Sequence, residues 1–73
     1  MHAPDLEAES IVLGEHRGWM STARRGAGFK VEIHLDGRRG VTSFAFSADR
    51  SAAQQQALRS ARQWLAANDN PES

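Results

Sequence analysis

Three polar side chains alternate along one segment and are the first candidates for chemistry. Glu32, His34 and Asp36 are separated by single apolar residues, so an extended strand would point all three the same way, about 7 Å apart. Imidazole and carboxylate groups suit zinc or manganese. The other two histidines, His2 and His16, fall in a predicted tail and a predicted loop, so no second imidazole converges on this row. We therefore expect a solvated strand face of mixed charge and no metal site.

Motifs for catalysis and for phosphate binding are missing from the sequence. The glycines Gly26 and Gly28 precede a predicted strand, whereas a phosphate loop opens a helix. Strand, turn and helix-cap positions account for five of the serines, which are Ser21, Ser43, Ser47, Ser51 and Ser60. With 73 residues and no cysteine, the chain is short for an enzyme and has no thiol chemistry. We predict no enzymatic activity, no cofactor and no small-molecule ligand.

Basic residues gather in the middle of the chain. The formal net charge is zero, but the segment 14–40 holds six arginines and lysines against three acids, while the first thirteen residues hold three acids and neither arginine nor lysine. Two arginine pairs occupy the two predicted hairpin turns, where they would bracket one face of a sheet. Clustered bases of this kind bind phosphate. The candidate nucleic-acid-binding residues are Arg24, Arg25, Lys30, His34, Arg38 and Arg39. The alternative is ordinary solvated charge in turns, with Glu32 and Asp36 repelling phosphate.

The clearest structural pattern is a period of two over residues 29–36. Apolar and polar residues alternate there, which is typical of a half-buried strand. Residues 36–40 form the next turn, and residues 41–46 the partner strand, with Thr42, Phe44 and Phe46 on one face. Residues 19–24 form an earlier strand, joined to the central one through residues 25–28. Residues 11–13 either add a fourth strand or pack under the sheet edge.

The hydrophobic period changes after Phe46. Ser51 and Gln54 fit a capping box, which predicts a helix that ends near Ala67 or Asn68. Its apolar stripe consists of Ala57, Leu58, Ala61, Trp64 and Leu65. We expect this helix to cover the sheet face that carries Phe29, Val31, Ile33 and Leu35. The opposite, open face would carry Lys30, Glu32, His34, Asp36, Val41, Ser43 and Ala45.

The fold class predicted is therefore α+β: a three-stranded antiparallel meander, or a four-stranded one, with one C-terminal helix across one face. It forms a single domain over residues 10–68, between a flexible acidic tail at 1–9 and a flexible tail at 69–73.

Trp64 is expected in the core. Trp19 is expected at the core edge, with an exposed stacking platform as the alternative. No apolar run approaches a membrane span, and the lack of cysteine favours a cytoplasmic protein.

Two resemblances accompany these residues. The span from Arg17-Gly18-Trp19 to Trp64 resembles a group of small proteobacterial strand-strand-strand-helix proteins with no assigned activity. More distantly, the layout is similar to APETALA-type plant DNA-binding domains and the arm-site-binding domain of tyrosine integrases. Those families lay a three-stranded sheet into the major groove. Lys30 and His34 match their exposed positions, whereas Glu32 and Asp36 depart from the basic pattern.

Two functions follow as expectations. The first is a non-enzymatic interaction module that uses the open sheet face to bind a protein partner or a second copy of the chain. The second is a nucleic-acid-binding module that uses the basic turns and the same face.

Overall fold

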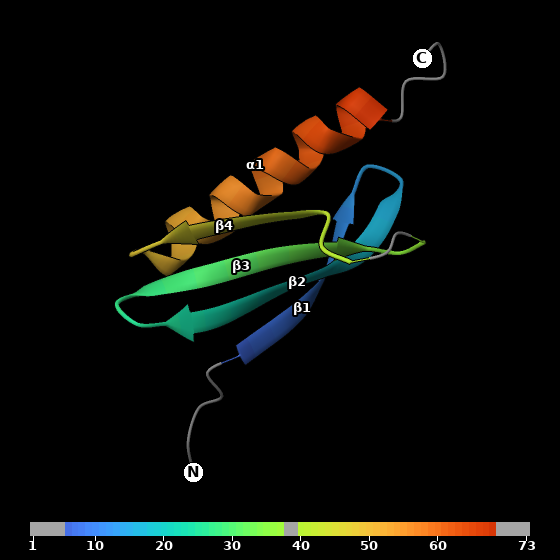
Figure 1. Cartoon of the computed structure of the whole chain (residues 1–73). Helices are drawn as coiled ribbons and strands as arrows, with labels where there is room; N and C mark the ends of the chain where they lie inside the picture. Colours follow the sequence, from blue (N-terminus) through green and yellow to red (C-terminus); the bar gives the residue numbers. More distant parts are fainter. Residues whose placement is uncertain (1–5, 38–39, 69–73) are drawn as a thin grey trace.

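The chain folds into a four-stranded antiparallel sheet followed by one helix (Figure 1). The computed structural model describes residues 6–37 and 40–68. The elements are β1 (Leu6–Leu13), β2 (His16–Arg25), β3 (Gly28–Leu35), β4 (Ser43–Ser47) and α1 (Arg50–Asn68). Each strand pairs with the next, in the order β1-β2-β3-β4. This confirms the predicted α+β meander with a C-terminal helix and resolves the open question in favour of four strands.

The first strand begins earlier than the sequence indicated. Residues 6–9, assigned to a flexible tail because of their acidic composition, form the first half of β1 and pair with Thr22 and its neighbours in β2. Charged residues are common on edge strands, where they oppose unwanted pairing, so acidity does not exclude a strand. The rest of that tail, residues 1–5, and the tail at 69–73 lie outside the described residues.

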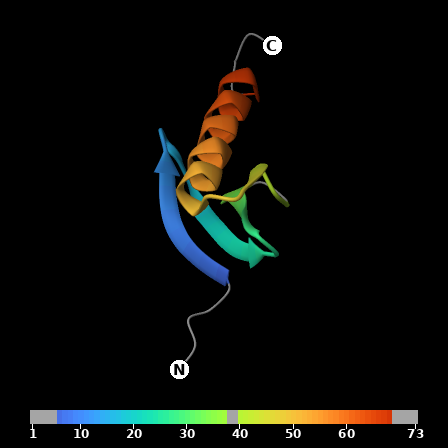
Figure 2. The same ribbon diagram turned by 90° about the vertical axis from the view of Figure 1, so that its left-hand side faces the viewer.

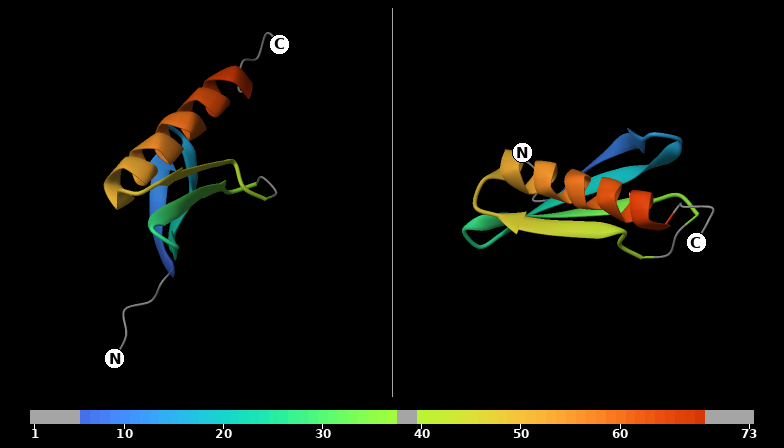
Figure 3. Two further views of the ribbon diagram at one scale, coloured as in Figure 1. Left: turned by 60° about the vertical axis from the view of Figure 1, so that its left-hand side comes forward. Right: turned by 90° about the horizontal axis from the view of Figure 1, so that it is seen from above.

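The core lies between β3 and the helix. Val31, Ile33 and Leu35 are buried as predicted, with Phe29 packed against them. On the helix, the three alanines at positions 53, 57 and 61 are fully buried, so the helix backbone approaches the sheet closely. The helix packs mainly on β4 and β3, while the β1–β2 hairpin extends beyond it (Figures 2 and 3).

The helix is capped by a different residue from the one predicted. Asp49 Oδ2 accepts a hydrogen bond from the Ala52 N–H at 2.8 Å, and the Asp49 carbonyl accepts one from the Ala53 N–H at 3.0 Å. The helix therefore begins at Arg50, and Ser51 is its second residue, not its cap. Gln54 does not complete a capping box. Its Nε2 donates instead to Thr22 Oγ1 at 3.0 Å and ties the helix to β2.

The faces of β4 are inverted relative to the prediction. Ala45 pairs with Val31 and lies under the helix, whereas Phe44 pairs with Glu32 and Phe46 with Lys30 on the other face. Ser43, predicted on the open face, donates from Oγ to the Ala57 carbonyl at 2.8 Å. The close approach of the alanine-rich helix favours small side chains beneath it. Because side chains alternate along a strand, one buried alanine turns both phenylalanines outward.

Trp19 also differs from the expectation. It is 53% exposed and lies on the open side of β2, so the stacking-platform alternative describes its position better than core packing does. Trp64 packs against the core as a partly buried side chain.

Candidate docking surface

The sheet has one face that the helix does not cover, which we call the open face. Its rows follow from the strand registers: Leu6–Ala23–Lys30–Phe46, Ala8–Ser21–Glu32–Phe44, Ser10–Trp19–His34 and Val12–Arg17. Cross-strand partners in antiparallel sheets share a face, so these side chains form one continuous surface. Arg25, the last residue of β2, extends this surface, because residues two apart in a strand lie on the same face and Ala23 is on the open face.

Large apolar side chains are concentrated on the open face. The exposed fractions are 65% for Phe44, 64% for Val12, 60% for Leu6, 56% for Phe46 and 53% for Trp19. Of the six exposed large hydrophobic residues among those described, only Val41 lies outside these strands. Scattered exposed apolar residues are normal, but a set gathered on one face is characteristic of a binding surface.

A charged group occupies the middle of this face. The Glu32 carboxylate lies 3.0 Å from Lys30 Nζ and 3.5 Å from His34 Nε2. The hydrogen bond from Lys30 is the main cause that lowers the pKa of Glu32 below its ordinary value, against a smaller opposing effect of burial. The carboxylate is thus held ionised beside a cation, which reduces its repulsion of an approaching anion.

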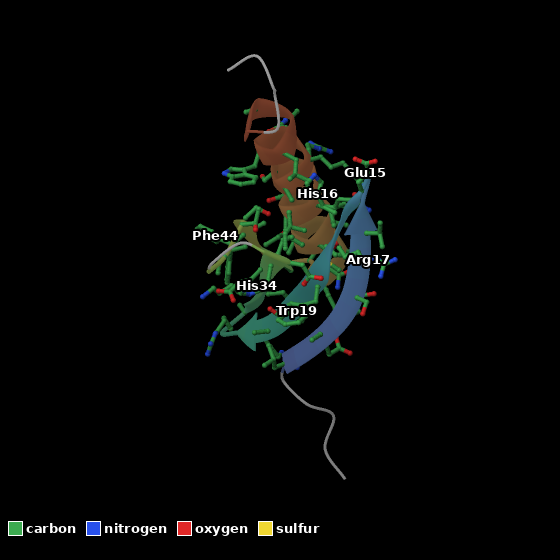
Figure 4. The ribbon with its side chains drawn as sticks, turned by 90° about the vertical axis from the view of Figure 1, so that its right-hand side faces the viewer. Glu15, His16, Arg17, Trp19, His34 and Phe44 are labelled. Atoms are coloured by element: carbon green, nitrogen blue, oxygen red, sulfur yellow. The ribbon has the colours of Figure 1, made fainter. Side chains whose placement is uncertain are left out.

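Trp19 and His34 form the aromatic part of the surface nearest its centre. Their ring centroids are 6.1 Å apart with an interplanar angle of 47°. Figure 4 shows the two side chains next to each other, with Phe44 farther toward the β4 edge. Exposed aromatic rings on a rigid sheet provide flat contact area at low conformational cost.

The open face is hollowed between β1 and β3. A depression of about 230 Å³ is lined by Leu6, Ser21, Ala23, Arg25, Lys30 and Glu32. It arises because Ser21 and Ala23 are small, whereas Leu6, Lys30 and Glu32 beside them have longer side chains. Its open shape and mixed lining suit a protruding side chain of a macromolecule better than an enclosed small ligand.

The predicted nucleic-acid-binding residues divide between the two faces. Lys30 and His34 lie on the open face, as expected. Arg25, expected in the hairpin turn, is instead the last residue of β2 and lies on the same face. Arg24 lies on the helix side, where its guanidinium is 5.9 Å from the centre of the Phe29 ring. Arg38 and Arg39 lie outside the described residues.

The possible metal row does not assemble. Glu32 and His34 are in contact, but Asp36 lies in the turn after β3, and the described part of the chain contains no group of three or more ligands suited to a metal.

Sequence reasoning missed the two phenylalanines of the surface. The only signal for them is the Phe44-Ala45-Phe46 alternation, which indicates that both rings share a face without indicating which face.

In the described part of the chain, no helix has the length and apolar character required to cross a membrane. Comparisons with protein-family models, with curated proteins and with solved structures find no match to this chain.

Proposed function

We propose that this chain is a small non-enzymatic interaction module whose docking surface is the open face. The observation that supports the proposal is the exposure of Leu6, Val12, Trp19, Phe44 and Phe46 on one side of the sheet. Leaving so much apolar area in water is unfavourable at roughly 25 cal/mol per Å², and a partner that covers it recovers that free energy. The rigid, hydrogen-bonded sheet keeps the ordering cost of binding low.

Site-specific photo-cross-linking in cells tests this proposal. A photoreactive benzoyl-phenylalanine replaces Phe44 in one variant and Arg59, exposed on the opposite side of the molecule, in the control. We expect covalent adducts from position 44 after irradiation and few from position 59. The adduct is scored whether it is protein, nucleic acid or a second copy of the chain. Equal yields at both positions, or no adduct at 44, would contradict the proposal.

Nucleic acid is the second candidate partner. The specific feature that favours it is the combination of aromatic rings with cations on one sheet: Trp19 and Phe44 lie beside Lys30, with Arg25 at the edge. Four-stranded sheets in other proteins bind single strands by stacking bases on exposed aromatic rings.

Fluorescence anisotropy with labelled single-stranded oligonucleotides tests the second candidate. Binding should weaken with salt and in the Arg25→Ala/Lys30→Ala variant. The matched control is Arg59→Ala/Arg62→Ala, which removes the same charge from the helix. Equal losses in both variants would indicate a non-specific charge effect, and no binding at low salt would eliminate this candidate.

A further inference from the structure

The sheet has two edge strands, and they differ in charge. In the described chain β1 and β4 each pair with one neighbour only, so each presents unpaired backbone N–H and C=O groups. Glu7 and Glu9 lie on β1, whereas β4 has no charged residue. Antiparallel pairing of two β1 strands about Ala8 would place Glu7 opposite Glu9 of the second copy, and like charges in that position are destabilising. The β4 edge lacks this protection.

The outward-facing backbone groups of β4 belong to its two phenylalanines. The Asp36 N–H donates to the Arg17 carbonyl at 2.8 Å. Because alternate residues of a strand direct their backbone N–H and C=O groups to opposite neighbours, the even-numbered residues of β3 form their backbone hydrogen bonds with β2. The odd-numbered residues of β3 therefore form theirs with β4, where Val31 pairs with Ala45. By the same alternation, the N–H and C=O groups of Phe44 and Phe46 point away from the sheet.

From this arrangement we propose that β4 is an edge-pairing site for a second copy of the chain, which pairs antiparallel with it about a two-fold axis at Ala45. This inference goes beyond the proposed function, because pairing at the β4 edge leaves Leu6, Val12 and Trp19 of the open face uncovered. In this register Phe44 lies opposite Phe46 of the second copy, and these are the residues whose backbone groups are free. The pairing joins two sheets into one of eight strands and gathers four phenylalanine rings on its open face. Aromatic cross-strand pairs of this kind stabilise a sheet.

The adjoining flank of the helix is compatible with this arrangement. Gln54 reaches β2, and Ser60 and Gln56 project from the other side of Ala57, toward the β4 edge, at 100° per residue. Both are exposed and uncharged. A second helix would therefore meet no charge repulsion along this flank.

Sedimentation over a concentration series tests the proposal. We expect the 8.0 kDa chain to convert to a species of twice that mass as concentration rises. Phe46→Lys should weaken dimerisation at least about 100-fold, because two lysines would lie in the pairing edge. Trp19→Lys makes the same aromatic-to-lysine change on the open face away from β4 and should leave the dissociation constant within about threefold. Circular dichroism establishes that both variants are folded.

A disulfide test examines the register. The chain has no cysteine, so any disulfide comes from introduced positions. Ser43→Cys and Ser47→Cys chains should cross-link when mixed, because the proposed register places these positions opposite each other, about 4.5 Å apart between Cα atoms. Neither chain should cross-link appreciably by itself.

The possible failures are distinguishable. A chain that remains monomeric at all concentrations overturns the second-copy proposal, and adducts from position 44 to another protein or to nucleic acid would then still support the proposed function. Dimerisation that survives Phe46→Lys but not Trp19→Lys overturns edge pairing in favour of face-to-face contact. If position 44 also gives no adduct, the proposed function fails with it.

Discussion

At the scale of single residues, the centre of the open face depends on Glu32 and its two neighbours. Lys30 Nζ at 3.0 Å and His34 Nε2 at 3.5 Å both favour the ionised carboxylate. The pKa of Glu32 is lowered mainly by Lys30. This arrangement stabilises the folded state above the ordinary glutamate pKa of about 4.5, and the stabilisation is lost as pH falls through the lower pKa of the folded state.

The change Lys30→Met should therefore raise the pKa of Glu32 toward its ordinary value. Removing the main hydrogen-bond donor leaves the effect of burial opposed only by His34. The measurement is an NMR titration of the Glu32 side-chain carboxyl carbon in both proteins. Arg25→Met is the control, since it removes a cation from the same face that is not among the causes of the shift. An unchanged pKa in Lys30→Met would show that the ion pair does not persist in solution.

At the scale of the elements, the helix start provides a direct comparison of two candidate caps. Asp49 makes the capping hydrogen bond to Ala52, whereas Ser51 is already inside the helix. Asp49→Ala should lower the free energy of unfolding by about 1 kcal/mol. Ser51→Ala should change it by less than about 0.5 kcal/mol. Urea denaturation of both variants measures the difference, and the reverse order would restore Ser51 as the cap.

The orientation of β4 has an equally clear consequence. Phe44→Thr keeps a good strand former and removes a ring that is 65% exposed, so the free energy of unfolding of the monomer should change by less than about 1 kcal/mol. Leu35→Ala, at a residue 3% exposed, should cost about 2–5 kcal/mol or unfold the domain. Denaturation at a concentration where the chain is monomeric compares the two. A large loss in Phe44→Thr would mean that the ring is buried in solution.

The three strands β3, β4 and β1 differ in how much of their structure the sequence alone predicts. The alternation around Val31 and Ile33 predicts β3 and its buried face because only one of its two faces is apolar. In β4 the sequence allows the two phenylalanines to face either the core or solvent, and burial of a phenylalanine side chain is favourable by about 1.5–3 kcal/mol. The rings face solvent because Ala53 and Ala57 bring the helix too close to the sheet for a ring to fit between them. The acidic start of β1 gives no apolar pattern, because that half of the strand is exposed on both sides.

The candidate site was predictable to a similar extent. The alternation of β3 places Lys30 and His34 on the open face from the sequence alone. The other features of the site depend on the pairing of strands that are distant in the sequence and on the strand boundaries. Trp19 joins His34 through the β2–β3 register, and Arg24 is separated from Arg25 because consecutive residues of a strand point to opposite faces.

At the scale of the whole molecule, one helix covers only part of a four-stranded sheet. A helix is about 10 Å wide and strands are about 4.8 Å apart, so α1 covers roughly two strands, β3 and β4. β1 is joined to the helix by the exposed Arg50–Glu7 ion pair, and such surface pairs contribute little stability. Leu13 and Met20 still join the core from β1 and β2, so the part of the sheet that the helix stabilises least is the start of β1.

Hydrogen exchange should follow this asymmetry. Among the strands, amides of β3 should exchange most slowly, because β3 is bonded on both sides and lies beneath the helix. Amides of residues 6–10 should exchange much faster, since this end of the edge strand is exposed on both faces. Residue-resolved exchange by NMR provides the ranking. Equal protection of β1 and β3 would show that the domain opens only as one cooperative unit.

The two tryptophans lie on opposite sides of the sheet: Trp19 is exposed on the open face, and Trp64 belongs to α1 and packs against the core. The domain thus contains two intrinsic fluorophores with separate environments. In a Trp64→Phe chain, the emission of Trp19 shifts to shorter wavelength only when something covers the open face. In a Trp19→Phe chain, the emission of Trp64 reports whether the fold is intact. Occupancy of the surface and integrity of the domain can therefore be followed independently, without attaching any label.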